Sequence, residues 1–408
     1  MSILFITGLY PNEYINQLNI LSNGKIQNAP NVFQWGIVEG LYKNNIDFNV
    51  VSLPFLPAYP LNYKKVKTLN GDITFNGEKI GDMLSYCNLL GYKTHSMQTV
   101  LYKYLCKWVN KNKDKKELII LTYTPYVPFV NAVKKIKKTN PNVKLVSIVT
   151  DLVDDMMNFA SNRTPLKRIQ SLMEIKKTKK LYKYIDAFVL LSKHMEDKIP
   201  EAKGRNVIVE GICATKEYTQ SEKSEERIIL YAGTLQEFSG VQDLVNAFSK
   251  TSNHNYRLII CGKGILSTMI TEAAEKDPRI IYKGMLPREE VLSLQQQSTV
   301  LINPRKPNGG ITRYSFPSKT VEYLSSGTPM IGYKLEGIPE EYFNYYYTID
   351  SLSEEDLVHT LDAVLSLPQD ELDKKAHSAY KFIMENKTAE KQVKKIIDFI
   401  KSRIDLKQ

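Results

Sequence analysis

The chain has 408 residues, more than one compact core usually holds. Its composition is 43% hydrophobic, 24% charged and 10% aromatic, which is typical of a globular protein and excludes large-scale disorder and collagen-like repeats. No apolar run approaches the roughly 20 residues of a membrane-spanning helix. The start, MSILFITGLYPNE, lacks the basic region and cleavage site of a signal peptide, so we expect a cytoplasmic protein. Four scattered cysteines without a C-x-x-C pair predict neither a disulfide framework nor a zinc site.

The net charge of +11 is unevenly distributed. Residues 1–210 carry 30 Lys and Arg against 17 Asp and Glu, whereas residues 211–408 carry 25 against 27. Within 101–150, eleven lysines face two acids. A basic first half favours an anionic partner, such as a phospholipid surface, a lipid phosphate or nucleic acid. The alternative is that these lysines are simply solvated on helix faces, as most surface charges are.

Short apolar runs alternate along the chain with longer segments of helical period. The expected strands of the first half are 3–7, 48–54, 118–123, 145–150, 187–192 and 207–211. Those of the second half are 228–233, 257–262, 280–284, 300–303 and 329–333. Helical segments between them include 31–43, 126–138, 241–250, 287–297 and 352–365. Strands that are nearly all apolar, without polar alternation, suit parallel sheets buried on both faces, so the pattern predicts an α/β fold with right-handed βαβ units in doubly wound sheets.

The break between the two halves falls in 213–226, CATKEYTQSEKSEE, a polar stretch between two apolar strands. We therefore expect a first domain over 1–212 and a second over 227–385. The tail 386–408 is a separate helix, because Val393, Ile396, Ile397 and Ile400 form one apolar stripe. The stretch 60–95 shows weak periodicity and is expected to be a long excursion over the first domain.

The loops after the strands are the expected ligand sites of such sheets. The most informative one lies in NPRKPNGGITRYSFPSKTVEYLSSGTPMIG, residues 303–332. A strand ends at Asn303, and a helix is expected to start near Pro317 and to stop at Gly327. Its N-terminus, with Arg305, Arg313 and Lys319 nearby, suits an anion such as a diphosphate.

Glu322, further along this helix, suits the hydroxyls of a vicinal diol such as a ribose. The alternative is a surface helix capped by chance, with Glu322 solvated. The residues alone do not separate these two interpretations.

The second half resembles the donor domain of family 4 retaining glycosyltransferases, which have the GT-B fold. The matching segments are ILYAGTLQEFSGVQDLVNAF, YRLIICGKG, IIYKGMLPREEVLSLQQQSTVLINP, FPSKTVEYLSSGTPMIG and GIPEE, about 110 residues at the family's spacings. The first half matches only in layout. The resemblance implies two Rossmann-like domains facing a cleft, with the nucleotide-sugar on the second, the acceptor on the first, and a C-terminal helix that crosses back to the first.

The resemblance also implies donor contacts, which fall on these positions: Gly233, Thr234, Gly264, Met285, Leu286, Tyr314, Phe316, Pro317, Ser318 and Glu322. Tyr314 stands where the family's first motif acid would be, and Thr234 and Ser239 stand where it often places Arg and Lys. Arg305 and Lys319 are the expected substitutes for holding the diphosphate. The first-domain His–Asp pair is Thr150-Asp151 here, so only the acid remains.

The implied reaction is transfer of a sugar from a UDP- or GDP-linked donor with retention, by same-face attack. Its largest catalytic contribution is stabilisation of the departing diphosphate, which Arg305 and Lys319 can supply. Asp151 is the expected contact to the sugar or acceptor across the cleft, although an Asp opening a helix is also a common N-cap. No D-x-D motif and no cluster of histidines is present, so we expect neither a metal nor a cofactor.

A sub-branch with FPSK before its single Glu is familiar among the capsule and exopolysaccharide enzymes of the family, and this chain resembles it. The expected acceptor is therefore a saccharide, free or on a polyprenyl diphosphate, and the protein is expected to be peripheral at the inner face of the cell membrane. The other hypotheses are a GT-B sugar-nucleotide epimerase, which needs more carboxylates and histidines than these loops offer, and a basic nucleic-acid-binding α/β protein. The lysines lack the aromatic interleaving of nucleic-acid modules, so we expect no nucleic-acid partner. The first strand is not followed by the G-x-G-x-x-G of NAD enzymes, so we do not expect an NAD enzyme.

Overall fold

The computed structural model describes residues 1–26, 28–154, 165–213, 217–218, 223–307 and 310–405. They form two compact units. The first unit comprises Met1–Glu210 together with the chain from Ala389 onward, and the second comprises Gly211–Thr388. Each unit is described by itself below.

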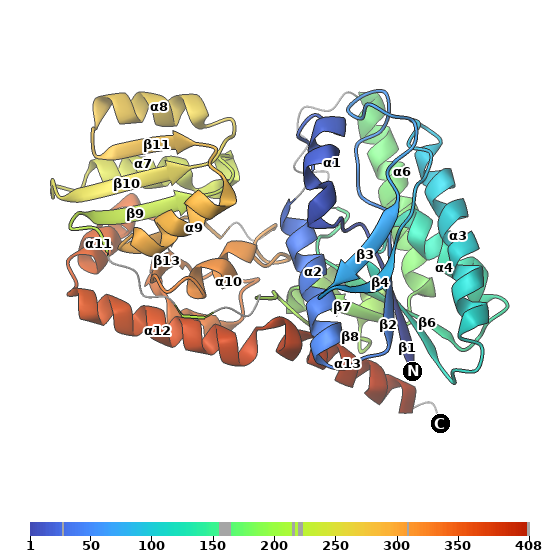
Figure 1. Ribbon diagram of the computed structural model, residues 1–408. Helices are drawn as coiled ribbons and strands as arrows, with labels where there is room; N and C mark the ends of the chain where they lie inside the picture. The colour runs from blue at the N-terminus through green and yellow to red at the C-terminus, as the bar shows by residue number, and fades with distance from the viewer. Residues whose placement is uncertain (27, 155–164, 214–216, 219–222, 308–309, 406–408) are drawn as a thin grey trace. The chain divides into compact units, whose positions relative to one another are not determined.

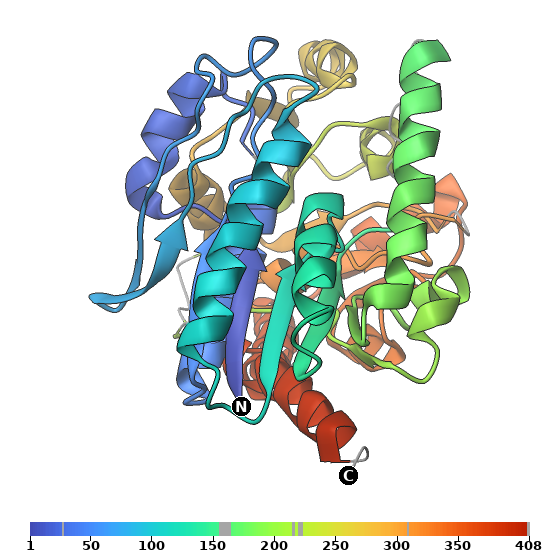
Figure 2. The ribbon, with the colours of Figure 1, turned by 90° about the vertical axis from the view of Figure 1, so that its right-hand side faces the viewer.

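The first unit is built on an eight-stranded sheet in the order β3-β4-β2-β1-β5-β6-β7-β8. Its strands are β1 (Ser2–Thr7), β2 (Phe48–Ser52), β3 (Gly71–Phe75), β4 (Glu78–Met83), β5 (Leu118–Tyr123), β6 (Val143–Val149), β7 (Ala187–Leu190) and β8 (Asn206–Ile208). Its helices are α1 (Ile15–Leu21), α2 (Asn28–Lys43), α3 (Lys93–Lys111), α4 (Val127–Lys137), α6 (Pro165–Leu181) and α13 (Ala389–Asp405). All neighbouring strands are parallel except the antiparallel pair β3–β4. Figure 2 shows α3 and α4 side by side over one face of this sheet.

The second unit is built on a fully parallel six-stranded sheet in the order β11-β10-β9-β12-β13-β14. Its strands are β9 (Arg227–Ala232), β10 (Tyr256–Cys261), β11 (Ile280–Gly284), β12 (Val300–Asn303), β13 (Met330–Tyr333) and β14 (Tyr347–Ile349). Its helices are α7 (Val241–Ser249), α8 (Ser267–Lys276), α9 (Arg288–Gln297), α10 (Ser318–Leu324), α11 (Glu354–Leu365) and α12 (Gln369–Asn386). Figure 1 shows α8 lying along the β11 edge.

The strands expected from the sequence are present, and their ends differ from the expected ones by at most three residues. All six residues of β1 and of β5 are buried, as apolar runs in the middle of a doubly covered sheet should be. The stretch 60–95, in which the sequence analysis places no strand, contains the hairpin β3–β4. Its turn is Asn76-Gly77, in which both residues have positive φ, and this pair is the preferred sequence of a tight hairpin turn.

Helix α13 belongs to the first unit, although it follows the second in sequence. The side chains of Val393, Ile396, Ile397 and Ile400 are buried at 3% exposure or less. Helix α13 packs on α2, and a Cβ added to Gly40 of α2 would lie 2.3 Å from Cγ2 of Val393. Glycine at position 40 therefore lets the two helix backbones approach closely.

Each sheet has one point where the chain order reverses. In the second sheet β9 lies between β10 and β12, and in the first sheet β1 lies between β2 and β5. Ligands of open α/β sheets bind beyond the carboxyl ends of the strands at such points. None of the described helices is both long enough and apolar enough to span a membrane.

Candidate functional site

Two cationic side chains meet at the carboxyl ends of β9 and β12. Lys319, the second residue of α10, extends its ammonium to the residue that follows β9, because a Cβ on Gly233 would lie 1.8 Å from its Nζ. The same Nζ lies 4.1 Å from the centroid of the Tyr231 ring. Any side chain at position 233 would therefore collide with Lys319. The face of the Tyr231 ring favours the charged form of the lysine through a cation–π contact. The structure therefore places the Lys319 ammonium at the chain reversal of the second sheet.

Arg305 is the second cation, on the loop that follows β12. Its guanidinium carbon lies 5.6 Å from the centroid of the Phe238 ring. Two of its nitrogen atoms, Nε and Nη2, are buried and have no hydrogen-bond partner among the described residues. Gly240 lets this loop approach the one after β9, since it has φ 74° and its Cβ would lie 2.0 Å from the carbonyl oxygen of Pro304. Buried donors without partners are costly, so these N–H groups are available for an anion.

The two cations influence each other. Burial lowers the pKa of the Lys319 ammonium to about 7, with Glu322 opposing the shift and Arg305 adding to it. Burial likewise lowers the pKa of the Arg305 guanidinium, which remains charged because an arginine starts so high. A bound anion would favour the charged form of Lys319 and reverse part of this shift.

Glu322 lies on the same short helix and is held by a neutral partner. Gln295, which is fully buried on α9, donates from Nε2 to Oε1 of Glu322 at 2.8 Å. Arg288 is more distant, with its Nη2 3.8 Å from Oε2. The helix itself is fixed to β9, because the hydroxyl of Tyr323 contacts both the amide and the carbonyl of Ala232 at 3.2 Å. Glu322 keeps about a third of its side chain exposed, so its carboxylate can still accept further hydrogen bonds.

Gln295, Tyr231 and Tyr323 were not found by sequence reasoning. Gln295 is one of three successive glutamines, and nothing in their pattern indicates which one points inward. The tyrosines lie in segments that contribute strand and helix core, where an aromatic residue is the ordinary occupant.

The glycines after β10 have a packing role. A Cβ on Gly262 would lie 1.8 Å from the carbonyl oxygen of Gly233, and one on Gly264 would lie 2.1 Å from that of Leu235. The two loops are also joined by a hydrogen bond from the amide of Gly233 to the carbonyl of Cys261 at 2.9 Å. Gly264 is thus needed for the close approach of two loops, and its expected donor contact stays a prediction.

The remaining predicted donor contacts lie on the loops at the same edge of the sheet. Thr234 follows Gly233, and its carbonyl accepts from the hydroxyl of Tyr231 at 2.8 Å. Met285, which is 70% exposed, and the partly exposed Leu286 follow β11. Ser239, expected where the family often has Lys, is buried, and its hydroxyl donates to the carbonyl of Gln236.

The segment before α10 holds Tyr314, Phe316, Pro317 and Ser318. Phe316 is buried, and its ring centroid lies 5.5 Å from that of Tyr342, so this side chain contributes to the core. Pro317 is the residue before the first helical turn, with extended backbone, and Ser318 begins the helix. Because α10 has seven residues, its dipole is small, and Arg305 and Lys319 are the main positive charges at this edge.

The first unit carries Asp151 two residues after the end of β6. Its side chain is exposed, yet the protein atoms around the carboxylate desolvate it and raise its pKa, with a hydrogen bond from Thr150 opposing the shift. Burial also raises the pKa of Tyr123, at the end of β5, while its hydrogen bond with Thr150 opposes that shift. Asp154 is occupied by an ion pair with Lys179 at 2.6 Å, and Asp155 lies outside the described residues. The group at the ends of β5 and β6 is therefore Tyr123, Thr150 and Asp151.

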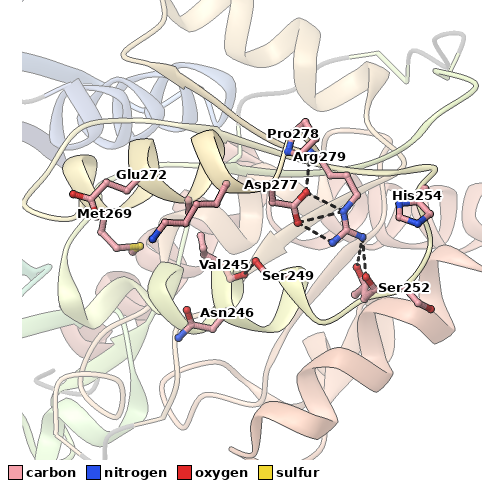
Figure 3. A pocket seen from close by; sticks show the side chains of 13 residues that line it. Val245, Asn246, Ser249, Ser252, His254, Met269, Glu272, Asp277, Pro278 and Arg279 are labelled. Atoms are coloured by element: carbon pink, nitrogen blue, oxygen red, sulfur yellow. Dashed lines mark hydrogen bonds and ion pairs between the residues drawn. The ribbon is translucent and has the colours of Figure 1, made fainter.

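A cavity of about 930 Å³ lies in the second unit, between α7 and α8 (Figure 3). Besides residues of the two helices, it is lined by the segments that precede β10 and β11, so it lies at the amino ends of these strands. Arg279 donates to both carboxylate oxygens of Asp277 and to the carbonyl of Thr251 at 2.8 Å. These contacts occupy the Arg279 guanidinium and lower the pKa of Asp277. The Arg279–Asp277 ion pair therefore has a structural role, and the cavity is separate from the edge of the sheet that carries Arg305 and Lys319.

Within the described ranges, no three His, Cys, Asp or Glu side chains are grouped so that they could hold a metal ion.

Comparison with known proteins bears on both units. Residues 214–382 match the family described as glycosyl transferases group 1, which is less than half of the chain. No curated protein matches the sequence. The structure is similar to sucrose-phosphate synthase from Thermosynechococcus elongatus, with TM-score 0.64, 12% identity and 100% of both chains covered.

Two further solved structures are similar over nearly the whole length. The catalytic domain of starch synthase IV from Arabidopsis thaliana, bound to ADP and acarbose, has TM-score 0.65 and 9% identity, with 99% of each chain covered. The apo form of the lipopolysaccharide outer core galactosyltransferase WaaB has TM-score 0.59 and 15% identity, with 99% of this chain and 100% of that chain covered. At such low identity these likenesses show the fold, which is GT-B: two Rossmann-like domains, as the sequence predicts.

Proposed function

We propose that the chain is a glycosyltransferase that moves a sugar from a nucleoside diphosphate sugar to the hydroxyl of a saccharide acceptor, with retention and without a metal. The observation that carries this proposal is the pair Arg305 and Lys319 at the chain reversal of the second sheet. The pair lies inside the segment that matches glycosyl transferases group 1. Departure of a diphosphate is the chemical event that two such cations are suited to assist.

The expected role of the two cations follows from the charge that develops in the reaction. As the bond from the sugar to the diphosphate breaks, negative charge grows on the phosphate oxygens. Arg305 offers buried donors that have no described partner, and Lys319 offers an ammonium fixed between Gly233 and Tyr231. Groups already fixed in place need little reorganisation as charge develops, which makes this kind of stabilisation a large catalytic contribution.

The other residues are assigned by their position at the same edge. Glu322 would accept the ribose hydroxyls, and the exposed Met285 with Leu286 would cover the base, uracil or guanine. We assign Asp151 of the first unit to the acceptor or the transferred sugar. The departing phosphate would take the proton of the attacking acceptor hydroxyl on the same face, so no second carboxylate is required.

We propose a role in surface polysaccharide synthesis, such as capsule or exopolysaccharide, with the acceptor on a polyprenyl diphosphate and the protein at the inner face of the membrane. The fold of a lipopolysaccharide galactosyltransferase is compatible with this role. The charge pattern supports an anionic surface, although several of the lysines concerned have partners, as Lys115 does with Asp47 and Lys137 with Asp186.

Nucleotide binding tests the proposal directly. In a thermal-shift screen with UDP, GDP and ADP, one nucleotide at about a hundred times its dissociation constant should stabilise the protein by about 2.7 kcal/mol. Arg305→Ala should remove most of this shift, because the buried donors would be lost. Lys306→Ala is the matched control, since the neighbouring Lys306 forms an ion pair with Asp243 at 2.9 Å. No shift with any nucleotide, or equal loss in both variants, would contradict the proposed function.

Incubation with the identified nucleotide-sugar and a saccharide acceptor then separates transfer from epimerisation. Transfer releases the nucleoside diphosphate and extends the acceptor with the anomeric configuration of the donor. Epimerisation would change the sugar without extending any acceptor.

A further inference from the structure

An exposed apolar surface lies in the first unit, on the segments that follow β2 and β4. The segments run side by side, since the amide of Leu90 donates to the carbonyl of Tyr59 at 2.9 Å and Lys67 bridges to Cys87. Five large side chains on them point into solvent and are called the apolar patch: Leu61 (64% exposed), Val66 (44%), Leu89 (41%), Leu90 (57%) and Tyr92 (48%). Figure 2 shows the segments at the end of the unit where α3 begins.

The segments that carry the apolar patch are firmly built. Tyr63 and Tyr86 are buried beneath them at 1% and 2% exposure. The hydroxyl of Tyr86 donates to the carbonyl of Pro54 at 2.6 Å, and Nδ2 of Asn88 donates to that of Pro57 at 2.7 Å. The exposure of the patch is therefore not that of a loose loop whose side chains failed to find a core. Contiguous exposed apolar side chains on an ordered scaffold indicate an interaction surface.

The surroundings of the apolar patch are cationic. Lys64, Lys65 and Lys67 are exposed, and none of them forms an ion pair or side-chain hydrogen bond within the described ranges. Residues 53–71 and 84–99 contain no Asp or Glu. Apolar side chains with a tyrosine and a rim of lysines are the pattern of proteins that lie in the interface of an anionic bilayer.

We propose that the apolar patch, with Lys64, Lys65 and Lys67, is the surface by which the protein docks on an anionic lipid bilayer. The patch follows the carboxyl ends of β2 and β4, and Asp151 follows the carboxyl end of β6 in the same sheet, in which β2, β4 and β6 all run parallel to β1. The patch thus lies at the end of the first unit where the acceptor is expected. The inference that docking brings the protein to its acceptor rests on the proposed function. A lipid-linked acceptor would reach that edge from the surface on which the patch is seated.

The lysines singled out by the charge pattern lie at the other end of the unit. Lys103, Lys107 and Lys111 occupy the second half of α3, which leads to the amino end of β5. The helix rises about 27 Å from Lys93 to Lys111, so the two surfaces are well separated. Its outer face carries lysines without exposed large apolar side chains, so binding through it would be purely electrostatic and fully released by salt. Docking through the apolar patch should instead keep a salt-resistant part.

Co-sedimentation with vesicles tests the proposal on the full chain. The protein should bind vesicles of phosphatidylcholine mixed with phosphatidylglycerol more tightly than vesicles of phosphatidylcholine alone. The double variants Leu89→Ser/Leu90→Ser and Lys64→Glu/Lys65→Glu should each lower the partition coefficient about tenfold or more. Two controls should remain within about twofold of the unaltered protein: Leu352→Ser, which changes an equally exposed leucine of the second unit, and Lys103→Glu/Lys107→Glu.

Two results would overturn the proposal. One is absence of binding to either vesicle at low salt, as expected if the patch receives another protein. The other is that Lys103→Glu/Lys107→Glu loses vesicle binding while Leu89→Ser/Leu90→Ser keeps it. The nucleotide thermal shift, measured on every variant, keeps this proposal apart from the proposed function. Vesicle binding without any nucleotide shift would contradict the enzyme assignment alone, and the reverse would contradict the docking surface alone.

Discussion

If the proposed function is right, Glu322 and Gln295 are the residues expected to distinguish a nucleotide from other diphosphates. The carboxylate is held at 2.8 Å by an amide that is itself fully buried. Gln295 cannot reach a ligand through that buried position, so it is a positioning residue for Glu322. We therefore expect substitutions of Glu322 or Gln295 to weaken recognition of the ribose and to leave recognition of the phosphates intact.

Glu322→Ala should weaken nucleoside diphosphate binding by roughly tenfold to a hundredfold, because a hydrogen bond to a charged group is worth about 1.5–3 kcal/mol. Binding of inorganic diphosphate should be unchanged, because Arg305 and Lys319 remain. Gln295→Leu should give a smaller loss and, like Glu322→Ala, should reduce the preference for the nucleotide over its 2′-deoxy form. Calorimetric titration of the nucleotide, its 2′-deoxy form and inorganic diphosphate into both variants and the unaltered protein measures these affinities. If Glu322→Ala weakens both diphosphates equally, the residue acts on the phosphates or on the fold.

Lys319 predicts a pH dependence near neutrality. Its pKa is lowered to about 7 without an anion, so near pH 7 about half of the molecules carry a neutral amine. A diphosphate favours the ammonium, so binding should take up about half a proton at pH 7, and affinity should fall as pH rises through 7. Calorimetry in buffers of different ionisation enthalpy measures this uptake, and Lys319→Met should remove it. Proton-neutral binding in the unaltered protein would contradict a role for Lys319 at the phosphates.

The same lowered pKa bears on stability. Between pH 7 and the pKa of an unfolded lysine, the unfolded chain binds more protons at this residue than the folded protein does. Stability therefore rises with pH across that interval, and the cost of the buried charge is fully present below pH 7. Lys319→Met should keep or raise the melting temperature while it weakens nucleotide binding, a combination expected of a residue kept for function.

At the scale of elements, the contact between α2 and α13 ties the end of the chain to the first unit. Gly40 lies against both Val393 and the carbonyl oxygen of Ala389, 2.3 Å and 2.4 Å from where a Cβ would be. Backbone cannot move aside as a flexible side chain can, so any larger residue forces the helices apart.

Gly40→Ala should lower the free energy of unfolding of the first unit by about 1–3 kcal/mol, even though alanine is the better helix former. Trp35 and Trp108, the two tryptophans of the chain, both lie in this unit, so their fluorescence in a denaturant titration reports its unfolding. Val32→Ala on the exposed side of α2 is the control and should have little effect. Unchanged stability in Gly40→Ala would show that α13 does not depend on this contact.

At the scale of the whole molecule, the two units divide the charge and the proposed tasks. The positive excess lies in the first half, while Arg305 and Lys319 lie in the near-neutral second half. Nucleotide binding and bilayer docking should therefore be separable by mutation.

Arg305→Ala should lose the nucleotide thermal shift and keep its partition onto anionic vesicles. Lys64→Glu/Lys65→Glu should show the reverse, since each substitution changes only one unit. The experiment measures the nucleotide thermal shift and the vesicle partition on each of the two variants. Joint loss in either protein would mean that a variant has unfolded or that the two tasks share a surface, and far-ultraviolet circular dichroism separates these cases.

The sequence by itself determined the class of fold and most of the strands. Runs such as those of β1 and β5 are almost entirely apolar, a pattern that suits a strand covered on both faces. Asn303, Pro317 and Gly327 also predicted the order of strand, loop and helix that the structure has from β12 to α10. The roles of Arg305, Lys319 and Glu322 in binding a ligand stay predictions. The hairpin at Asn76-Gly77 was within reach of the sequence, since its turn pair is diagnostic even where the periodicity is weak.

Only the tertiary structure decided which side chains meet. That Lys319 lies against Gly233 and Tyr231, that Gln295 is the glutamine that turns inward to Glu322, and that Gly40 makes room for Val393 all depend on contacts between residues distant in sequence. Exposure is likewise a property of the packed molecule. Leu61 and Leu90 resemble core residues in the sequence, and only the folded first unit shows them in solvent beside unpaired lysines. Local patterns specify backbone conformation, whereas a site is the product of where the backbone brings its side chains.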